Sequence, residues 1–88
     1  MRVDRFLFFI RLAKSRTLAQ AIVGEGRVRI DGRRALKPSE EVRPGSTVTL
    51  PLRGEIRVLR VVALPARRGP PSEAQSCYEV IDEQQRAT

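Results

Sequence analysis

Hydrophobic positions near the start of the chain recur at the spacing of a helix. Phe6, Leu7 and Ile10 would share one face, so the sequence predicts a first helix that runs through them toward Leu12. Asp4 is expected to be its N-cap, because an aspartate carboxylate accepts the unpaired amide hydrogens of a first helical turn.

A second helix is predicted over residues 16–23. Ser15 is expected to cap its start, and Gly24 or Gly26 is expected to end it. The apolar side of this helix is expected to comprise Leu18, Ala21 and Ile22, and the opposite side to carry Arg16 and Gln20.

The spacing then changes to the alternation typical of a strand. Val28 and Ile30 are expected to point inward, and Arg27 and Arg29 to lie on the opposite face. The Asp-Gly pair at 31–32 predicts a tight turn directly after this strand.

Two further strands are predicted at 47–50 and 56–62, where β-branched residues are frequent. The Lys-Pro-Ser and Arg-Pro-Gly segments at 37–39 and 43–45 read as a loop and a turn. The predicted fold class is therefore α+β, with two N-terminal helices packed on a small, mostly antiparallel sheet.

One domain is predicted over residues 1–64, and residues 65–88 are predicted to form a C-terminal extension. Three prolines and a glycine at 65–71 exclude a regular element there. A short helix is expected at 72–78, and residues 79–88 are expected to be frayed.

Positive charge is concentrated in the first part of the chain. Residues 38–88 carry seven basic and seven acidic groups, so the net charge of +7 belongs to residues 1–37. That segment holds three acids against ten basic residues, namely Arg2, Arg5, Arg11, Lys14, Arg16, Arg27, Arg29, Arg33, Arg34 and Lys37. A localised site for a polyanion is the natural interpretation.

The residue types needed for several other functions are missing from the sequence. There is no histidine, and Cys77 is the only cysteine, so a four-ligand zinc site, a catalytic triad and an internal disulfide are excluded. The protein is therefore not expected to be an enzyme, and no cofactor, metal, membrane or small-molecule substrate is predicted. A monomer in the reducing cytoplasm is expected.

The start of the second predicted helix combines features that bind phosphate. A phosphate at this position would contact the side chains of Lys14, Ser15 and Arg16. It would also accept hydrogen bonds from the free amide hydrogens at the positive end of the helix dipole. If the face carrying Arg27 and Arg29 lies beside this helix, the cations form one patch. RNA is favoured over DNA, because no long recognition helix for a major groove is evident.

Four segments in this order resemble a known family. They are 2–7 (RVDRFL), 14–19 (KSRTLA), 26–32 (GRVRIDG) and 37–39 (KPS). Together they are similar to the RNA-binding domain named after small-subunit ribosomal protein S-four.

The resemblance implies which residues contact RNA and which form the fold. Family glycines are matched by Gly26 and Gly32, and family core positions by Leu7, Ala19, Val28 and Val42. With Arg11 from the charge pattern, the expected RNA-binding residues are Arg2, Arg5, Arg11, Lys14, Ser15, Arg16, Gln20, Arg27, Arg29 and Lys37.

The later segments 67–74 (RRGPPSEA) and 77–79 (CYE) resemble a ribosome-associated heat-shock branch of the same family. This resemblance implies binding to structured ribosomal RNA of the large subunit, and a role in recycling stalled subunits. Members of that branch continue into a long basic C-terminal helix and tail.

Two alternatives remain open at this point. The domain is often fused to RNA-modifying enzymes, so the chain could be an RNA-targeting module for a separate enzyme such as a pseudouridine synthase. Binding of polyanions in general, without a defined target, is the other alternative.

Overall fold

The computed structural model describes residues 1–81, in which five antiparallel strands form one sheet. Its order is β2-β1-β3-β4-β5. The strands are β1 (Arg29–Ile30), β2 (Arg33–Arg34), β3 (Thr47–Leu52), β4 (Glu55–Val61) and β5 (Tyr78–Val80). The helices are α1 (Val3–Phe9), α2 (Arg16–Gly24) and α3 (Pro71–Gln75). The predicted α+β class is confirmed.

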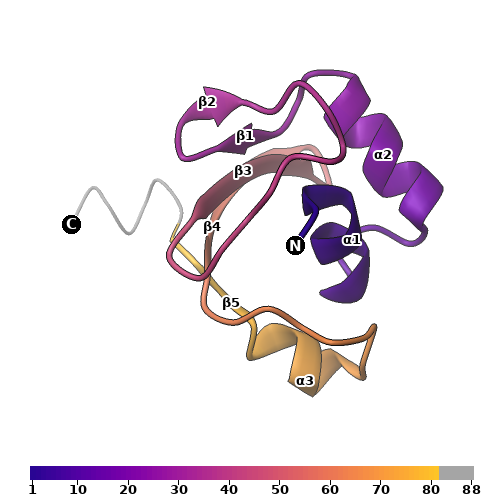
Figure 1. The fold of residues 1–88 in the computed structure, drawn as a ribbon, viewed down its shortest axis with the longest axis vertical. Coiled ribbons are helices and arrows are strands. Elements are labelled where there is room, and N and C mark those ends of the chain that lie inside the picture. Colours follow the sequence, from indigo (N-terminus) through magenta and orange to yellow (C-terminus); the bar gives the residue numbers. More distant parts are fainter. Residues whose placement is uncertain (82–88) are drawn as a thin grey trace.

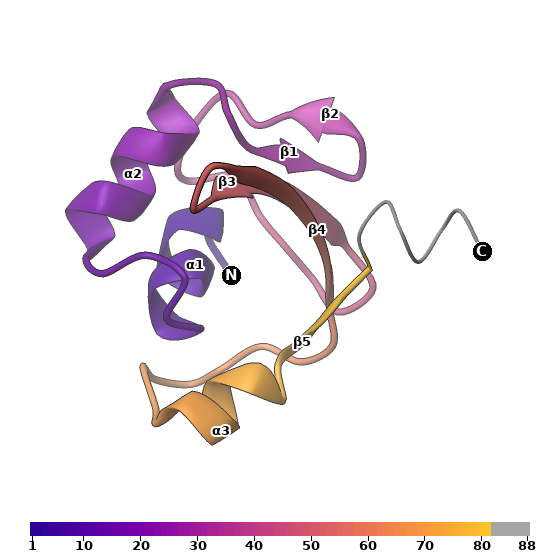
Figure 2. The ribbon, with the colours of Figure 1, turned by 180° about the vertical axis from the view of Figure 1, so that it is seen from behind.

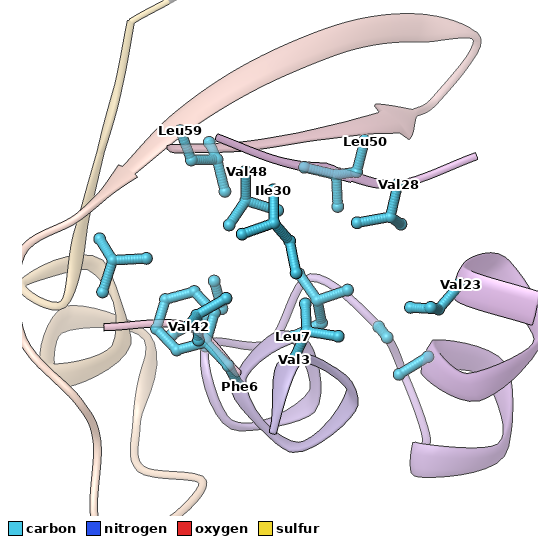
Figure 3. Packing of buried hydrophobic residues seen from close by; sticks show 14 of the residues in the cluster. Val3, Phe6, Leu7, Val23, Val28, Ile30, Val42, Val48, Leu50 and Leu59 are labelled. Atoms are coloured by element: carbon cyan, nitrogen blue, oxygen red, sulfur yellow. The ribbon is translucent and has the colours of Figure 1, made fainter. Parts of the chain in front are cut away.

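The sheet curves around α1, with α2 beside one end of it and α3 beside the other (Figure 1, Figure 2). Figure 3 shows the core between these layers. Phe6 and Leu7 of α1 pack under Val48 and Leu59, which face each other on β3 and β4. Burying each such side chain contributes about 1.5–3 kcal/mol to the free energy of folding, so this contact between the helix and the sheet stabilises the small domain.

The first helix differs from its prediction at both ends. Arg2 occupies the N-cap position without a side-chain cap bond, and Asp4 lies inside the first turn as a fully buried residue. Asp4 is not the cap because its side chain turns inward, where donors from α2 are available. The helix ends at Phe9, and Arg11 adopts a positive φ of 68° that cannot continue an α-helix.

The second helix begins where predicted, but it is rotated about its axis. The Ser15 hydroxyl oxygen accepts a hydrogen bond from the Leu18 amide at 3.0 Å, which confirms the cap. The buried residues are Ala19 and Val23, whereas Leu18 is 43% exposed. The expected apolar side is therefore wrong for Leu18 and Ala21, which are exposed, whereas Ile22 is partly buried against the core. Arg16 and Gln20 are exposed as predicted, and Gln20 also donates a hydrogen bond to Asp4 of α1.

The alternation and the turn that follow the second helix are confirmed. Val28 and Ile30 are buried, while Arg27 and Arg29 are exposed. Asp31 and Gly32 both have positive φ, 53° and 83°, as a type I′ hairpin turn requires.

The segment after β4 returns to the sheet. Tyr78 pairs with Val61 and Glu79 with Arg60, so β5 contradicts the expectation that residues 79 and 80 are frayed. The short helix α3 ends at Gln75, earlier than expected. The Ile81 amide also donates to the Val58 carbonyl oxygen of β4 at 2.8 Å, and residues 82–88, the rest of the stretch expected to be frayed, lie outside the described residues.

Candidate nucleic-acid interface

Side chains from the start of α1 and from the first two turns of α2 meet at the buried carboxylate of Asp4. Arg2 donates from Nε to Oδ1 at 3.1 Å and from Nη2 to Oδ2 at 3.0 Å. Gln20 donates from Nε2 to Oδ2 at 3.2 Å, and Nη2 of Arg16 lies 3.9 Å from the same oxygen. We call these four residues the Asp4 cluster. It holds three predicted RNA-binding side chains around one anion.

The Asp4 carboxylate stays ionised in this environment. Burial raises the pKa of Asp4, but hydrogen bonds from Arg2, Gln20 and the backbone amide of Arg5 outweigh burial and leave the pKa below its usual value. A charged acceptor binds its donors more strongly than a neutral one does. The Asp4 carboxylate, which lies on the buried side of the cluster, therefore fixes the orientation of the Arg2 guanidinium.

The start of α2 presents the phosphate-binding features expected from the sequence. Ser15 accepts its cap bond through Oγ, and Lys14 and Arg16 are exposed on either side of it. Arg16 is also the residue that links this helix start to the Asp4 cluster. An anion placed here would meet the helix dipole and two cations together.

Arg27 and Arg29 lie at the other end of α2. A helix of nine residues is about 13 Å long, so these arginines are separated from Lys14 by the length of α2. Arg27 pairs with Glu25 at 3.6 Å, and Nη1 of Arg29 donates to the Gly32 carbonyl oxygen at 3.3 Å. The structure does not bring Arg27 or Arg29 into contact with the cations at the start of α2.

The remaining candidates border α1. Lys37 lies in a loop that runs beside the first turn, where the Asp4 amide donates to the Pro38 carbonyl oxygen at 3.3 Å. Arg5 is exposed one residue beyond Asp4. Arg11 follows the end of α1 and donates from Nη1 to the Gly69 carbonyl oxygen at 3.0 Å. Lys37 and Arg5 thus flank the Asp4 cluster, whereas Arg11 lies at the opposite end of α1.

The residue missing from the sequence-based set is Asp4. The sequence predicts a capping role for Asp4, but the structure gives it the central position among Arg2, Arg16 and Gln20. The available signal was an acid inside a strongly basic segment, at a position that falls on the inner side of the first helical turn. A carboxylate there is retained only when donors satisfy it, and the donors come from a second helix.

Other kinds of site find no support among the described residues. Residues 1–81 contain no cluster of three or more acidic or cysteine side chains that could hold a metal ion. None of the helices in this part of the chain has the length and apolar character needed to cross a bilayer.

Comparisons with known proteins relate the chain to RNA-associated proteins. The model of the S4 domain family matches residues 1–48. Heat shock protein 15 of Escherichia coli (strain K12) is 37% identical over 90% of this chain and 59% of its own length. The RQC P-site tRNA stabilizing factor of Bacillus subtilis (strain 168) is 34% identical over 96% of this chain and 95% of its own length.

A solved structure agrees over the whole fold. Heat Shock Protein 15 of Vibrio cholerae, described as trimeric, matches with a TM-score of 0.88 and 30% identity, covering 99% of this chain and 86% of that chain. The chain spans about three fifths of the length of the Escherichia coli relative.

Proposed function

The chain belongs to the S4 domain family, and on this premise we propose that it binds structured RNA through the Asp4 cluster and the start of α2. The observation that carries the proposal is the shared buried carboxylate, which orients Arg2 and brings Gln20 beside Arg16. Cations held in fixed positions lose less freedom on binding than flexible ones do. The surface therefore suits a rigid, structured polyanion.

The proposed target is the large ribosomal subunit, through its RNA or the tRNA that it carries. The names of two relatives, Heat shock protein 15 and RQC P-site tRNA stabilizing factor, support a ribosome-associated role. On this proposal the protein recognises stalled subunits and helps to recycle them. It acts by binding in the cytoplasm, without covalent chemistry of its own.

A monomer is the proposed state of the protein. The Vibrio cholerae relative is described as trimeric. Analytical ultracentrifugation of this protein at micromolar concentration separates the two states, and a trimer would contradict this part of the proposal.

The decisive experiment combines sedimentation with RNA crosslinking. Tagged protein in lysate is run through a sucrose gradient, and the crosslinked RNA is sequenced. Co-migration with free large subunits and crosslinks in large-subunit RNA or tRNA are expected. Protein that stays at the top of the gradient, or crosslinks only to the RNA target of a modifying enzyme, would contradict the ribosomal target and favour the targeting-module alternative.

The RNA surface is tested by substitution. Replacing Lys14 and Arg16 together with alanine (K14A/R16A) should weaken binding to purified large subunits, because two phosphate contacts are lost. A matched control, R43A/R67A, removes the same charge elsewhere and should bind like the parent protein. Unchanged affinity of K14A/R16A, with folding verified by circular dichroism, would refute the proposed surface.

Salt dependence separates defined binding from general attraction to polyanions. With about five neutralised phosphates, affinity should fall by about 10² to 10³ between 50 and 200 mM salt. At 200 mM salt, large subunits should still compete better than an equal mass of heparin. Equal competition by heparin would indicate unspecific polyanion binding.

A further inference from the structure

The turn between β3 and β4 brings an additional arginine to the predicted basic surface. Arg53, at the tip of this hairpin, lines an open pocket of about 230 Å³ together with Arg11 and Arg57. The remaining lining residues of this arginine pocket are Leu12, Leu52 and Glu55. Arg53 thereby joins Arg11, a predicted RNA-binding residue, although it lies outside the segment that matches the S4 domain family.

Arg53 also lies near Arg27, at the other end of the predicted RNA-binding surface. A neighbouring pocket is lined by Arg53, by Ile22 of α2 and by Arg27. Arg53 is the arginine common to both pockets, so it lies between Arg11 and Arg27. The hairpin tip thus connects cations that the two helices alone leave apart.

The backbone at both arginines is one that an arginine adopts only at a cost. Arg53 has a φ of 51° and Arg11 a φ of 68°, and Asp31 is the only other non-glycine residue within residues 1–81 with a positive φ. Glycine or asparagine adopts this left-handed backbone conformation with less strain than arginine does, and the strain for arginine is on the order of 1 kcal/mol per residue. Two strained arginines therefore line one pocket, as is common where a side chain serves binding.

The charge of Arg53 is not neutralised within the described part of the chain. After residue 38, glutamates pair with three arginines, in the pairs Arg57–Glu55, Arg60–Glu79 and Arg67–Glu73. Arg53 is exposed and makes no ion pair or side-chain hydrogen bond with residues 1–81. Glu55, the acid in the pocket, lies 2.9 Å from Arg57.

We propose that Arg53 and Arg11 together bind a phosphate of the RNA backbone, so that the β3–β4 hairpin tip is a second contact of the RNA interface. This inference rests on the proposed RNA-binding function and adds a site to it. Guanidinium groups suit phosphate because their planar donors match its oxygens. The hairpin tip sets the position of the Arg53 backbone, and the hydrogen bond from Arg11 Nη1 to the Gly69 carbonyl oxygen holds the other guanidinium at the end of α1.

The test is the substitution Arg53→Asn. Asparagine is favoured at a positive φ before a glycine, so the variant should be as stable as the parent protein or more stable. Binding to purified large subunits should nevertheless weaken by about fivefold to tenfold, because a phosphate contact is lost. The slope of log K against log [salt] should become shallower by about 0.9. Affinity that falls while stability holds cannot come from unfolding.

The matched control is Arg43→Asn. Arg43 is also exposed and lies in the turn before β3, at the end of that strand opposite the hairpin tip. It removes the same charge, so a general electrostatic effect would weaken both variants equally. We expect R43N to bind within twofold of the parent protein.

Each outcome decides one of the two proposals. If R53N binds like the parent protein while K14A/R16A loses affinity, the hairpin contact is wrong and the RNA-binding function stands. If the parent protein itself fails to bind large subunits, the proposed function is wrong as well. Polyglutamate serves as a probe that offers carboxylates instead of phosphates. If R53N retains its affinity for RNA but loses affinity for polyglutamate, the pocket binds acidic protein segments and the phosphate proposal is overturned.

Discussion

Replacing Asp4 with asparagine removes one negative charge from a fully buried position and keeps the size of the side chain. The carboxylate accepts bonds from Arg2 at both oxygens, from Gln20 at one and from the Arg5 amide at the other. Asparagine offers one acceptor oxygen, and its NH₂ group would face donors. At least one donor of the cluster must then lose its partner.

The expected loss of stability follows from these contacts. A hydrogen bond to a charged group contributes about 1.5–3 kcal/mol, and breaking a buried ion pair costs about 3–5 kcal/mol. Arg2 and Arg16 are each 43% exposed, so solvent screens their interaction with Asp4 and lowers the loss. We expect D4N to be less stable by about 2–3 kcal/mol at pH 7. A domain of this size has roughly 5–10 kcal/mol, so the variant should still fold.

The loss should depend on pH in one direction. The folded pKa of Asp4 lies below its unfolded value, so its contribution is present above that unfolded value and is lost as pH falls through the folded pKa. The difference between the parent protein and D4N should therefore shrink below about pH 4. Glu40, whose pKa is lowered by Arg33, is present in both proteins and cancels in the comparison.

Urea unfolding followed by circular dichroism, at steps from pH 7 to pH 3, measures this difference. Glu25→Gln is the matched control, because it removes one negative charge from an exposed pair with Arg27. It should change stability by less than about 0.5 kcal/mol. Equal stability of D4N and the parent protein at pH 7, or a difference that does not change with pH, would refute the role given to the carboxylate.

RNA affinity separates orientation from overall charge. D4N has one more net positive charge, so long-range electrostatics alone predicts tighter binding to large subunits. If Asp4 orients Arg2 and Arg16, the variant should instead bind more weakly at equal folded fraction. Tighter binding would show that the Asp4 cluster holds the fold only.

Two further substitutions test contacts outside the cluster. Ser15→Ala removes the cap that accepts the Leu18 amide and should cost about 1 kcal/mol in urea unfolding; unchanged stability would contradict the capping role. Arg68→Gln removes a guanidinium that lies 4.6 Å from the centroid of the Phe8 ring and donates to the Phe8 carbonyl oxygen at 3.2 Å. It should cost about 1–2 kcal/mol, with Arg67→Gln, which breaks an exposed pair, as a near-neutral control.

Features encoded by neighbouring residues could be predicted from the sequence. Ser15 caps α2 because its hydroxyl reaches an amide three residues later. Val28 and Ile30 are buried because alternate strand residues point to one face. The turn at 31–32 forms because both residues tolerate positive φ. Each of these outcomes needs only a few consecutive residues.

Features set by distant partners could not be predicted. The inward turn of Asp4 and the rotation of α2 depend on each other, since Gln20 reaches across to the carboxylate. The edge strand β5 has three residues and no alternating pattern, and it forms because β4 offers it unpaired backbone groups. Arg53 and Arg11 line one pocket only once the β3–β4 hairpin and the segment that follows α1 have come together in the fold.

Net charge counted along the chain is an incomplete guide to the surface that a polyanion meets. Residues 38–88 are neutral in sequence, which predicts that this half adds nothing to RNA binding. In the folded protein, Glu55 and Glu79 are each held by an arginine at 3.2 Å or less, so their fields are largely cancelled locally. Arg53 keeps its full charge beside Arg11. A segment whose charges sum to zero can therefore still present cations that no acidic side chain pairs with. The pattern of ion pairs in the folded protein identifies these cations, whereas the net charge of the segment does not.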